Sequence, residues 1–275
     1  TVSTMARGLL DTLQNNSSIL SDGSVDSSEV ADLFPLASIT VVVGHYGVGK
    51  TNFSLNLAID AAALGQQVTL IDLDVVNPYF RSSEYASVLK DAGVTLISPV
   101  FAGSTLDSPS LSGTIDTVLT DVIDRGPAGA CACETPRTCL IIDAGGDDVG
   151  ATALGRFAGK IAPHPYTMFY VINAYRNLTH EPEEAAALLA EIEIKSHLKA
   201  TGIVNNSHLQ DDTTEQVITD AQPFAQATAD ILSLPLVCTT VPNTLVEQKN
   251  RAFSSGSVSR KAYPVKVYVR APWHR

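Results

Sequence analysis

The octapeptide GHYGVGKT at residues 44–51 constrains this chain more than any other stretch of its sequence. It fits the pattern G-x-x-x-x-G-K-[ST] at every fixed position. Glycines in such a loop let the backbone form a concave nest of N–H groups, and the following helix adds roughly half a positive charge at its N-terminus. The loop therefore predicts a phosphate-binding site in which Lys50 reaches the β- and γ-phosphates and the Thr51 hydroxyl binds Mg²⁺.

The sequence on both sides of this loop has the order that the motif requires. Residues 38–43 form a β-branched apolar run typical of a buried strand, and residues 52–64 are compatible with a helix that closes at Gly65. Further apolar runs alternate with helical patterns along the chain. The alternation predicts an α/β fold, a three-layer sandwich with a mainly parallel, doubly wound sheet.

Composition divides the 275 residues into three parts. Residues 1–36 are rich in Ser, Asn, Asp and Gly and are predicted to be an N-terminal arm or linker. Residues 37–248 are predicted to be the nucleotide-binding domain. Residues 249–275 carry seven Lys or Arg and no Asp or Glu, which predicts a basic extension with one edge strand at residues 265–269.

Charge and hydropathy exclude some classes of function. The net charge of −11 argues against general nucleic-acid binding. No run approaches the roughly 18 apolar residues of a membrane span, and no signal sequence opens the chain, so we expect no transmembrane segment and a cytoplasmic location.

Two further apolar runs end in carboxylates. The run at residues 67–74 ends in Asp72 and Asp74, and the run at residues 138–143 ends in Asp143. Ligands in open α/β sheets bind beyond the carboxyl ends of the strands, so these side chains are expected beside the phosphates. One aspartate of the first pair would hold Mg²⁺ through water while the other orients the attacking water, and Asp143 would act on the metal side. Alternatively, Asp72 and Asp74 cap the next helix.

Two loops carry less specific signals. Residues 77–81 combine an Asn-Pro turn, two aromatic residues and Arg81, which suits either a loop that faces a switch or substrate, or one that packs its aromatics into the core. Cys131, Cys133 and Cys139 are close enough in sequence to hold a soft metal or cluster, but reduced thiols in a surface insertion are the simpler interpretation.

At these residues the chain resembles the MinD, ParA and cobyrinic acid synthase group of P-loop NTPases, in the SIMIBI class that also contains the nitrogenase iron protein and dethiobiotin synthetase. The resemblance covers roughly residues 38–245 and rests on GHYGVGKT, DLD, IIDAGG and the strand tips IVNN and VPN. The stretches DLDVVNPYFR and GGDDVGATALGR look closer to a bacterial subgroup of ATP-binding proteins than to MinD itself.

The resemblance implies ATP and Mg²⁺ as cofactors. It places catalytic roles on Asp74 (switch I) and Asp143 (Walker B). Together with the phosphate-loop motif and the carboxylates at the strand ends, this makes Lys50, Asp74 and Asp143 the expected catalytic residues and Thr51, Asp72 and Asp143 the expected metal ligands. The nucleotide contacts that it implies are Gly47, Gly49, Lys50, Thr51 and Asn52, with adenine contacts at Asn205, Pro242 and Asn243. Gly44 and Val48 are expected to join them as members of the phosphate loop.

One position departs from the pattern of the group. MinD and ParA have a signature lysine in K-G-G-x-G-K that reaches across a nucleotide-sandwiched dimer, and this chain has His45 there. A histidine, with a reference pKa of about 6.5, is a poorer fixed cation than lysine. An arginine, Arg81 or Arg156, is therefore expected to supply the charge in place of the lysine. Alternatively, His45 is an ordinary loop residue without a role in the site.

The leading functional hypothesis is an ATP-hydrolysing switch whose nucleotide state is read by an unidentified protein partner, with a homodimer among the assemblies that the resemblance implies. ATP is favoured because no N-K-x-D motif follows any strand. The alternative is an ATP-dependent ligase or kinase of the dethiobiotin or cobyrinate type, which would activate a small-molecule acceptor.

Overall fold

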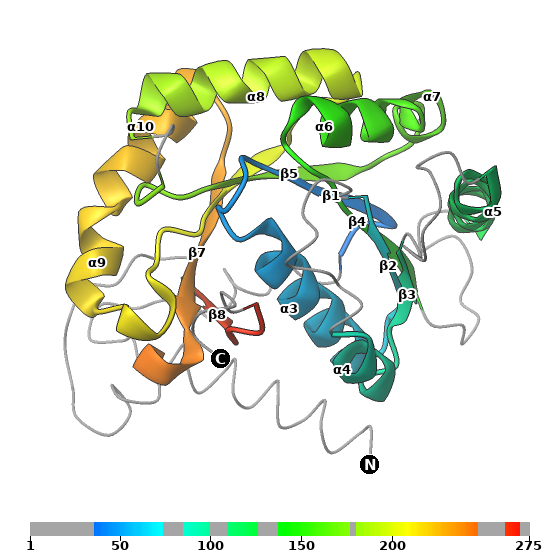
Figure 1. Cartoon of the computed structure of the whole chain (residues 1–275), viewed down its shortest axis with the longest axis horizontal. Helices are drawn as coiled ribbons and strands as arrows, with labels where there is room; N and C mark the ends of the chain where they lie inside the picture. The colour runs from blue at the N-terminus through cyan, green and yellow to red at the C-terminus, as the bar shows by residue number, and fades with distance from the viewer. Residues whose placement is uncertain are drawn as a thin grey trace.

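The computed structural model describes residues 36–73, 85–98, 109–125, 137–176, 180–246 and 262–269. Its strands are, in chain order, β1 (Ile39–Val43), β2 (Gln67–Asp72), β3 (Thr95–Ile97), β4 (Thr138–Asp143), β5 (Thr167–Ile172), β6 (Gly202–Asn205), β7 (Leu236–Pro242) and β8 (Ala262–Val265). They form one sheet in the order β3-β2-β4-β1-β5-β6-β7-β8, and every neighbouring pair is parallel (Figure 1).

Helices cover both faces of this sheet. Within the described ranges they are α3 (Lys50–Ala63), α4 (Ala86–Asp91), α5 (Pro109–Arg125), α6 (Asp148–Gly155), α7 (Ala158–Ile161), α8 (Pro182–Ser196), α9 (Glu215–Asp220) and α10 (Gln222–Leu232), together with the 3₁₀ turn η2 (Gln210–Asp212). The predicted fold class, a doubly wound α/β sandwich, is confirmed. None of the helices in the described ranges is long and apolar enough to cross a membrane.

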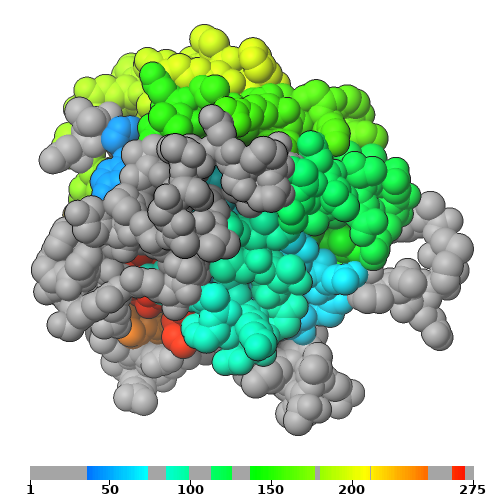
Figure 2. Space-filling view, turned by 45° about the vertical axis from the view of Figure 1, so that its right-hand side comes forward, coloured from blue at the N-terminus to red at the C-terminus, as the bar shows by residue number. Residues whose placement is uncertain are grey.

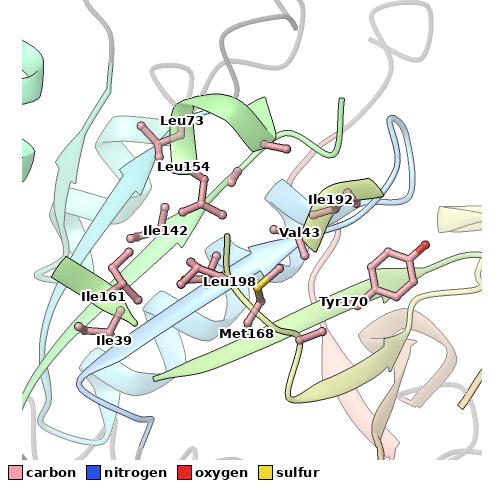
Figure 3. Close-up of a cluster of buried hydrophobic side chains, with 14 of the residues drawn as sticks. Ile39, Val43, Leu73, Ile142, Leu154, Ile161, Met168, Tyr170, Ile192 and Leu198 are labelled. Carbon is pink, nitrogen blue, oxygen red and sulfur yellow. The ribbon is translucent and has the colours of Figure 1, made fainter. Parts of the chain in front are cut away.

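The central strands are buried on both faces, which is why they are continuous apolar runs. One core lies between the sheet and helices α5, α6, α7, α8 and α10, and it contains Val43, Ile142 and Tyr170 (Figure 3). Figure 2 shows α6 and α8, coloured green to yellow-green, covering the top of the molecule. Because side chains alternate along a strand, Val42 faces the opposite core, under α3.

The second core contains an aromatic cluster on α3. Phe53 makes edge-to-face contacts with Phe169 at 6.0 Å and with Tyr263 at 5.9 Å between ring centroids. Such contacts add roughly 0.5–1.5 kcal/mol to the burial of each ring pair. The helix that follows the phosphate loop is thereby anchored to β5 and β8.

Two helices end where the local backbone changes. A turn at residues 156–157 separates α6 from α7, and there Phe157 N donates to the carbonyl of Leu154, three residues back, at 3.0 Å. Helix α8 ends at Ser196, where His197 takes the left-handed conformation that glycine usually supplies (φ 56°).

The C-terminal extension contributes a strand to the sheet edge, at Ala262–Val265 instead of the expected residues 265–269. The next residues bind side chains of α3 instead of a neighbouring strand. Asn56 accepts from Lys266 N at 2.8 Å and donates to Lys266 O at 2.9 Å, and Asn52 Oδ1 accepts from Tyr268 N at 2.8 Å. We call residues 266–269 the strap. The boundaries 1–36, 37–248 and 249–275 stay predictions.

Candidate functional site

The phosphate loop connects β1 to α3 with glycine at the positions that need it. Gly49 takes a left-handed conformation (φ 93°), and a Cβ there would collide with the amide of Asn206. Gly146, in the loop after β4, lies so close to the loop that a Cβ would collide with the Gly44 carbonyl. Only glycine fits these two positions, so the backbone of the cradle is shaped as a phosphate site requires.

Lys50 opens α3 and is buried at 5% exposure. Its Nζ donates to the carbonyl oxygen of His45 at 3.1 Å, which holds the ammonium group across the mouth of the loop. A phosphate in the cradle would offer this group stronger, charge-assisted hydrogen bonds than a neutral carbonyl does. The phosphate-binding role of Lys50 stays a prediction.

The carboxylates that the sequence predicts near the metal lie side by side. Asp72 and Asp143 are register partners at the carboxyl ends of the parallel strands β2 and β4, and both are buried. Thr51 is part-buried in the first turn of α3. Carboxylate and hydroxyl oxygens are hard donors that suit Mg²⁺, which usually takes one or two carboxylates and completes its shell with water and phosphate. The donor set therefore fits Mg²⁺.

The described part of the chain shows no cluster of the kind that holds a soft metal ion. No group of three or more His, Cys, Asp or Glu side chains is placed there to hold an ion. Cys139 lies in the core beneath α3, and burial raises the pKa of its thiol to about 12. A neutral thiol is a poor metal ligand. Cys131 and Cys133 lie outside the described residues, as do Asp74 and the loop of residues 77–81 with Arg81.

Asn206 is the site residue that sequence reasoning missed. Its Nδ2 donates to the Val48 carbonyl at 2.6 Å, and its Oδ1 accepts from Thr240 at 2.5 Å. This fully buried amide ties the middle of the phosphate loop to β7. The pair of amides at the tip of β6 was a visible signal, but it did not say which amide faces the loop.

The predicted base contacts are placed as follows. Asn205 is fully buried; its Nδ2 donates to Thr239 at 3.4 Å and its Oδ1 accepts from Ser207 N at 3.2 Å. Pro242 ends β7 and is buried, and Asn243 follows it with an exposed side chain. The amide oxygen of Asn52 holds the strap, while its Nδ2 is buried and has no hydrogen-bond partner among the residues that the structure describes. The nucleotide roles of these residues stay predictions.

His45 and Arg156 are the candidate cations that lie within the described residues. His45 is half-buried, and its Nδ1 lies 3.1 Å from the Tyr46 carbonyl. Arg156 is exposed at the C-terminal end of α6, one helix length beyond the N-cap Asp147, whose side chain accepts from Gly150 N at 2.7 Å. The structure thus brings together Lys50, Thr51, Asp72 and Asp143 around the loop but leaves Arg156 at the far end of α6.

Most of the described chain is similar to proteins of known family. The family model "CobQ/CobB/MinD/ParA nucleotide binding domain" matches residues 39–233, more than two thirds of the chain. The antiactivator FleN of Pseudomonas aeruginosa is 45% identical over 47 residues, which are 17% of this chain and 17% of FleN. The chain therefore matches about a sixth of that curated relative.

Similar solved structures have low sequence identity. FtsY from Mycoplasma mycoides is 16% identical, with 86% of this chain and 73% of that chain covered and a TM-score of 0.48. The signal recognition particle 54 kDa protein from Aeropyrum pernix K1, in complex with GDP, is 16% identical, with 82% and 46% covered and a TM-score of 0.49. On the extent of the family match, this chain belongs to the CobQ/CobB/MinD/ParA nucleotide-binding family.

Proposed function

We propose that this chain is a Mg²⁺-dependent switch that binds and hydrolyses ATP and whose nucleotide state is read by a protein partner. The observation that carries the proposal is the placement of a glycine-shaped phosphate loop beside Asp72 and Asp143 at one edge of a parallel sheet. A cradle for phosphates next to a pair of acidic side chains is what Mg²⁺-dependent phosphoryl chemistry needs.

Each residue has a distinct part in this proposal. Lys50 exchanges the His45 carbonyl for the β- and γ-phosphates, and the Thr51 hydroxyl, Asp72 and Asp143 hold Mg²⁺ directly or through water. The metal, when bound, neutralises charge that develops on the transferred phosphoryl group. Asp74, which follows β2 in sequence, orients the attacking water.

ATP is proposed over GTP because of the loop after β6. Residues 205–208 read N-N-S-H, so His208 stands where N-K-x-D would supply the carboxylate that reads guanine. Burial, with a smaller contribution from the charge of Arg176, lowers the pKa of His208 to about 4. Its Nδ1 accepts from Gln210 N at 3.2 Å. A neutral imidazole used in this way does not replace a carboxylate that accepts two hydrogen bonds.

The switch would work through its loops. Residues that follow β2 and β4 would close on the triphosphate and relax after hydrolysis, and a partner would recognise the closed form. The partner is proposed to be another protein or a second copy of this chain in a homodimer, in the cytoplasm.

The test is ADP release from purified protein with Mg·ATP and no added acceptor. We expect slow turnover that is lost in Lys50→Ala and absent with Mg·GTP. Asp74→Ala should keep ATP binding and lose turnover. Wild-type turnover in Asp74→Ala would contradict the role of that residue. ATP binding without any turnover would contradict the self-contained ATPase and favour a ligase or kinase that needs a small-molecule acceptor.

A further inference from the structure

We propose that Arg176, in the loop after β5, binds the γ-phosphate of ATP held by the same chain and supplies the positive charge of the signature lysine, whose position His45 occupies. The proposal rests on the proposed function, since it assigns a phosphate contact within the same site. It replaces Arg81 and Arg156 with a residue that the sequence did not single out.

The sheet brings the Arg176 loop to the phosphate loop. Strand β5 is the parallel neighbour of β1 on the side opposite β4, with Val43 opposite Tyr170. The loops that follow β1 and β5 therefore both lie at the carboxyl end of the strands. The approach is close, because a Cβ on Gly44 would collide with the Val171 carbonyl. The phosphate loop thus lies between Asp143 on β4 and the turn that carries Arg176.

Hydrogen bonds define the conformation of that turn. Tyr175 N donates to the side chain of Asn173 at 2.9 Å, and Arg176 N donates to the Asn173 carbonyl at 3.3 Å. Ala174 N donates to Ser207 Oγ at 2.9 Å, which joins the turn to the loop after β6. The Tyr175 hydroxyl donates to the Val217 carbonyl on α9 at 2.5 Å. A side chain on such a turn has a defined starting point.

From this turn Arg176 reaches the middle of the phosphate loop. Its Nε lies 4.0 Å from the position that a Cβ on Gly47 would occupy. Both Arg176 and Gly47 are exposed, so the guanidinium group lies at the open side of the cradle and is not buried beneath it. A planar guanidinium with five N–H donors is well suited to phosphate oxygens.

The adjacent histidine His208 does not duplicate this charge. His208, in the adjacent loop, is buried and stays neutral at pH 7, since burial and Arg176 together lower its pKa to about 4. His45 occupies the signature-lysine position, and its ring lies against the Tyr46 carbonyl. Lys50 and Arg176 are then two basic side chains that the structure places against the loop, near His45 and Gly47 respectively.

The test compares affinities for Mg·ATP, Mg·ADP, inorganic tripolyphosphate and adenosine by calorimetry. A charge-assisted hydrogen bond at an exposed site predicts that Arg176→Ala weakens binding of Mg·ATP and tripolyphosphate about tenfold. It should change Mg·ADP much less and adenosine not at all, and Arg176→Lys should restore part of the loss.

The matched control is Arg137→Ala, which removes an exposed arginine just before β4, at the amino-terminal end of that strand and so at the end of the sheet away from the phosphate loop. It should bind all four ligands like the wild type. Equal weakening of ATP and ADP in Arg176→Ala, or unchanged ATP affinity, would overturn the proposal while leaving the proposed function intact. If the wild type bound neither ATP nor tripolyphosphate, both would be overturned.

Discussion

Replacing Asn206 with alanine tests how the phosphate loop is held in shape. The side chain is 2% exposed and makes two hydrogen bonds, from Nδ2 to Val48 O at 2.6 Å and to Oδ1 from Thr240 at 2.5 Å. Each buried hydrogen bond between neutral groups contributes about 1 kcal/mol, and each partner left without one costs about 1–3 kcal/mol. We therefore expect the free energy of unfolding to fall by about 2–4 kcal/mol.

The assay is urea unfolding, with the slope against denaturant compared so that a change in midpoint reports stability alone. The control is Gln226→Ala, an exposed amide on α10 that donates to Asp230, for which we expect a loss below about 0.5 kcal/mol. ATP affinity should fall in Asn206→Ala, since the Val48–Gly49 backbone loses its anchor. A stability loss as small as that of the control, with unchanged ATP affinity, would refute the reasoning.

Two further predictions concern the contacts that α3 makes with the C-terminal residues. Burial raises the pKa of Asp60 to about 6 although Tyr263 donates to it at 2.6 Å, so the folded state loses stability as the pH rises from about 4 to about 6. Asp60→Asn should remove this loss and raise the free energy of unfolding by about 1–3 kcal/mol at pH 7.5 but not at pH 4. Thermal unfolding at both pH values checks this. An equal effect of the substitution at pH 4 and pH 7.5 would contradict the prediction. Asn56→Ala should lower the free energy of unfolding by about 1–3 kcal/mol and speed amide hydrogen exchange of the strap, because the Lys266 backbone loses both of its hydrogen bonds to Asn56. Exchange is measured by mass spectrometry, and an unchanged rate would show that Asn56 does not hold the strap.

The sequence predicted the parts of this molecule that depend on local pattern. A glycine-rich loop between a buried strand and a helix marked the phosphate loop, and apolar runs ending in Asp72 and Asp143 predicted carboxylates at the ends of strands. The structure adds that these two strands are neighbours. These features follow from strand periodicity and from the parallel sheet, where all carboxyl ends meet at one edge.

Features that depend on distant contacts were not predicted. Asn206 faces the phosphate loop through hydrogen bonds with Val48 and Thr240, which lie 158 and 34 residues away in sequence. The strap is held by Asn52 and Asn56, more than 200 residues away in sequence, so no local pattern could show it. Sequence spacing likewise carries no sign that the Arg176 turn lies against Gly47.

The central claim, that the loop at residues 44–51 binds the triphosphate of ATP with Lys50 as its main cation, is tested most directly by equilibrium titration of Mg·ATP. The account predicts saturable binding to the wild type, at least about tenfold weaker binding to Lys50→Ala from the loss of charge-assisted hydrogen bonds, and little competition by Mg·GTP. Equal affinity of the wild type and Lys50→Ala for Mg·ATP would contradict it.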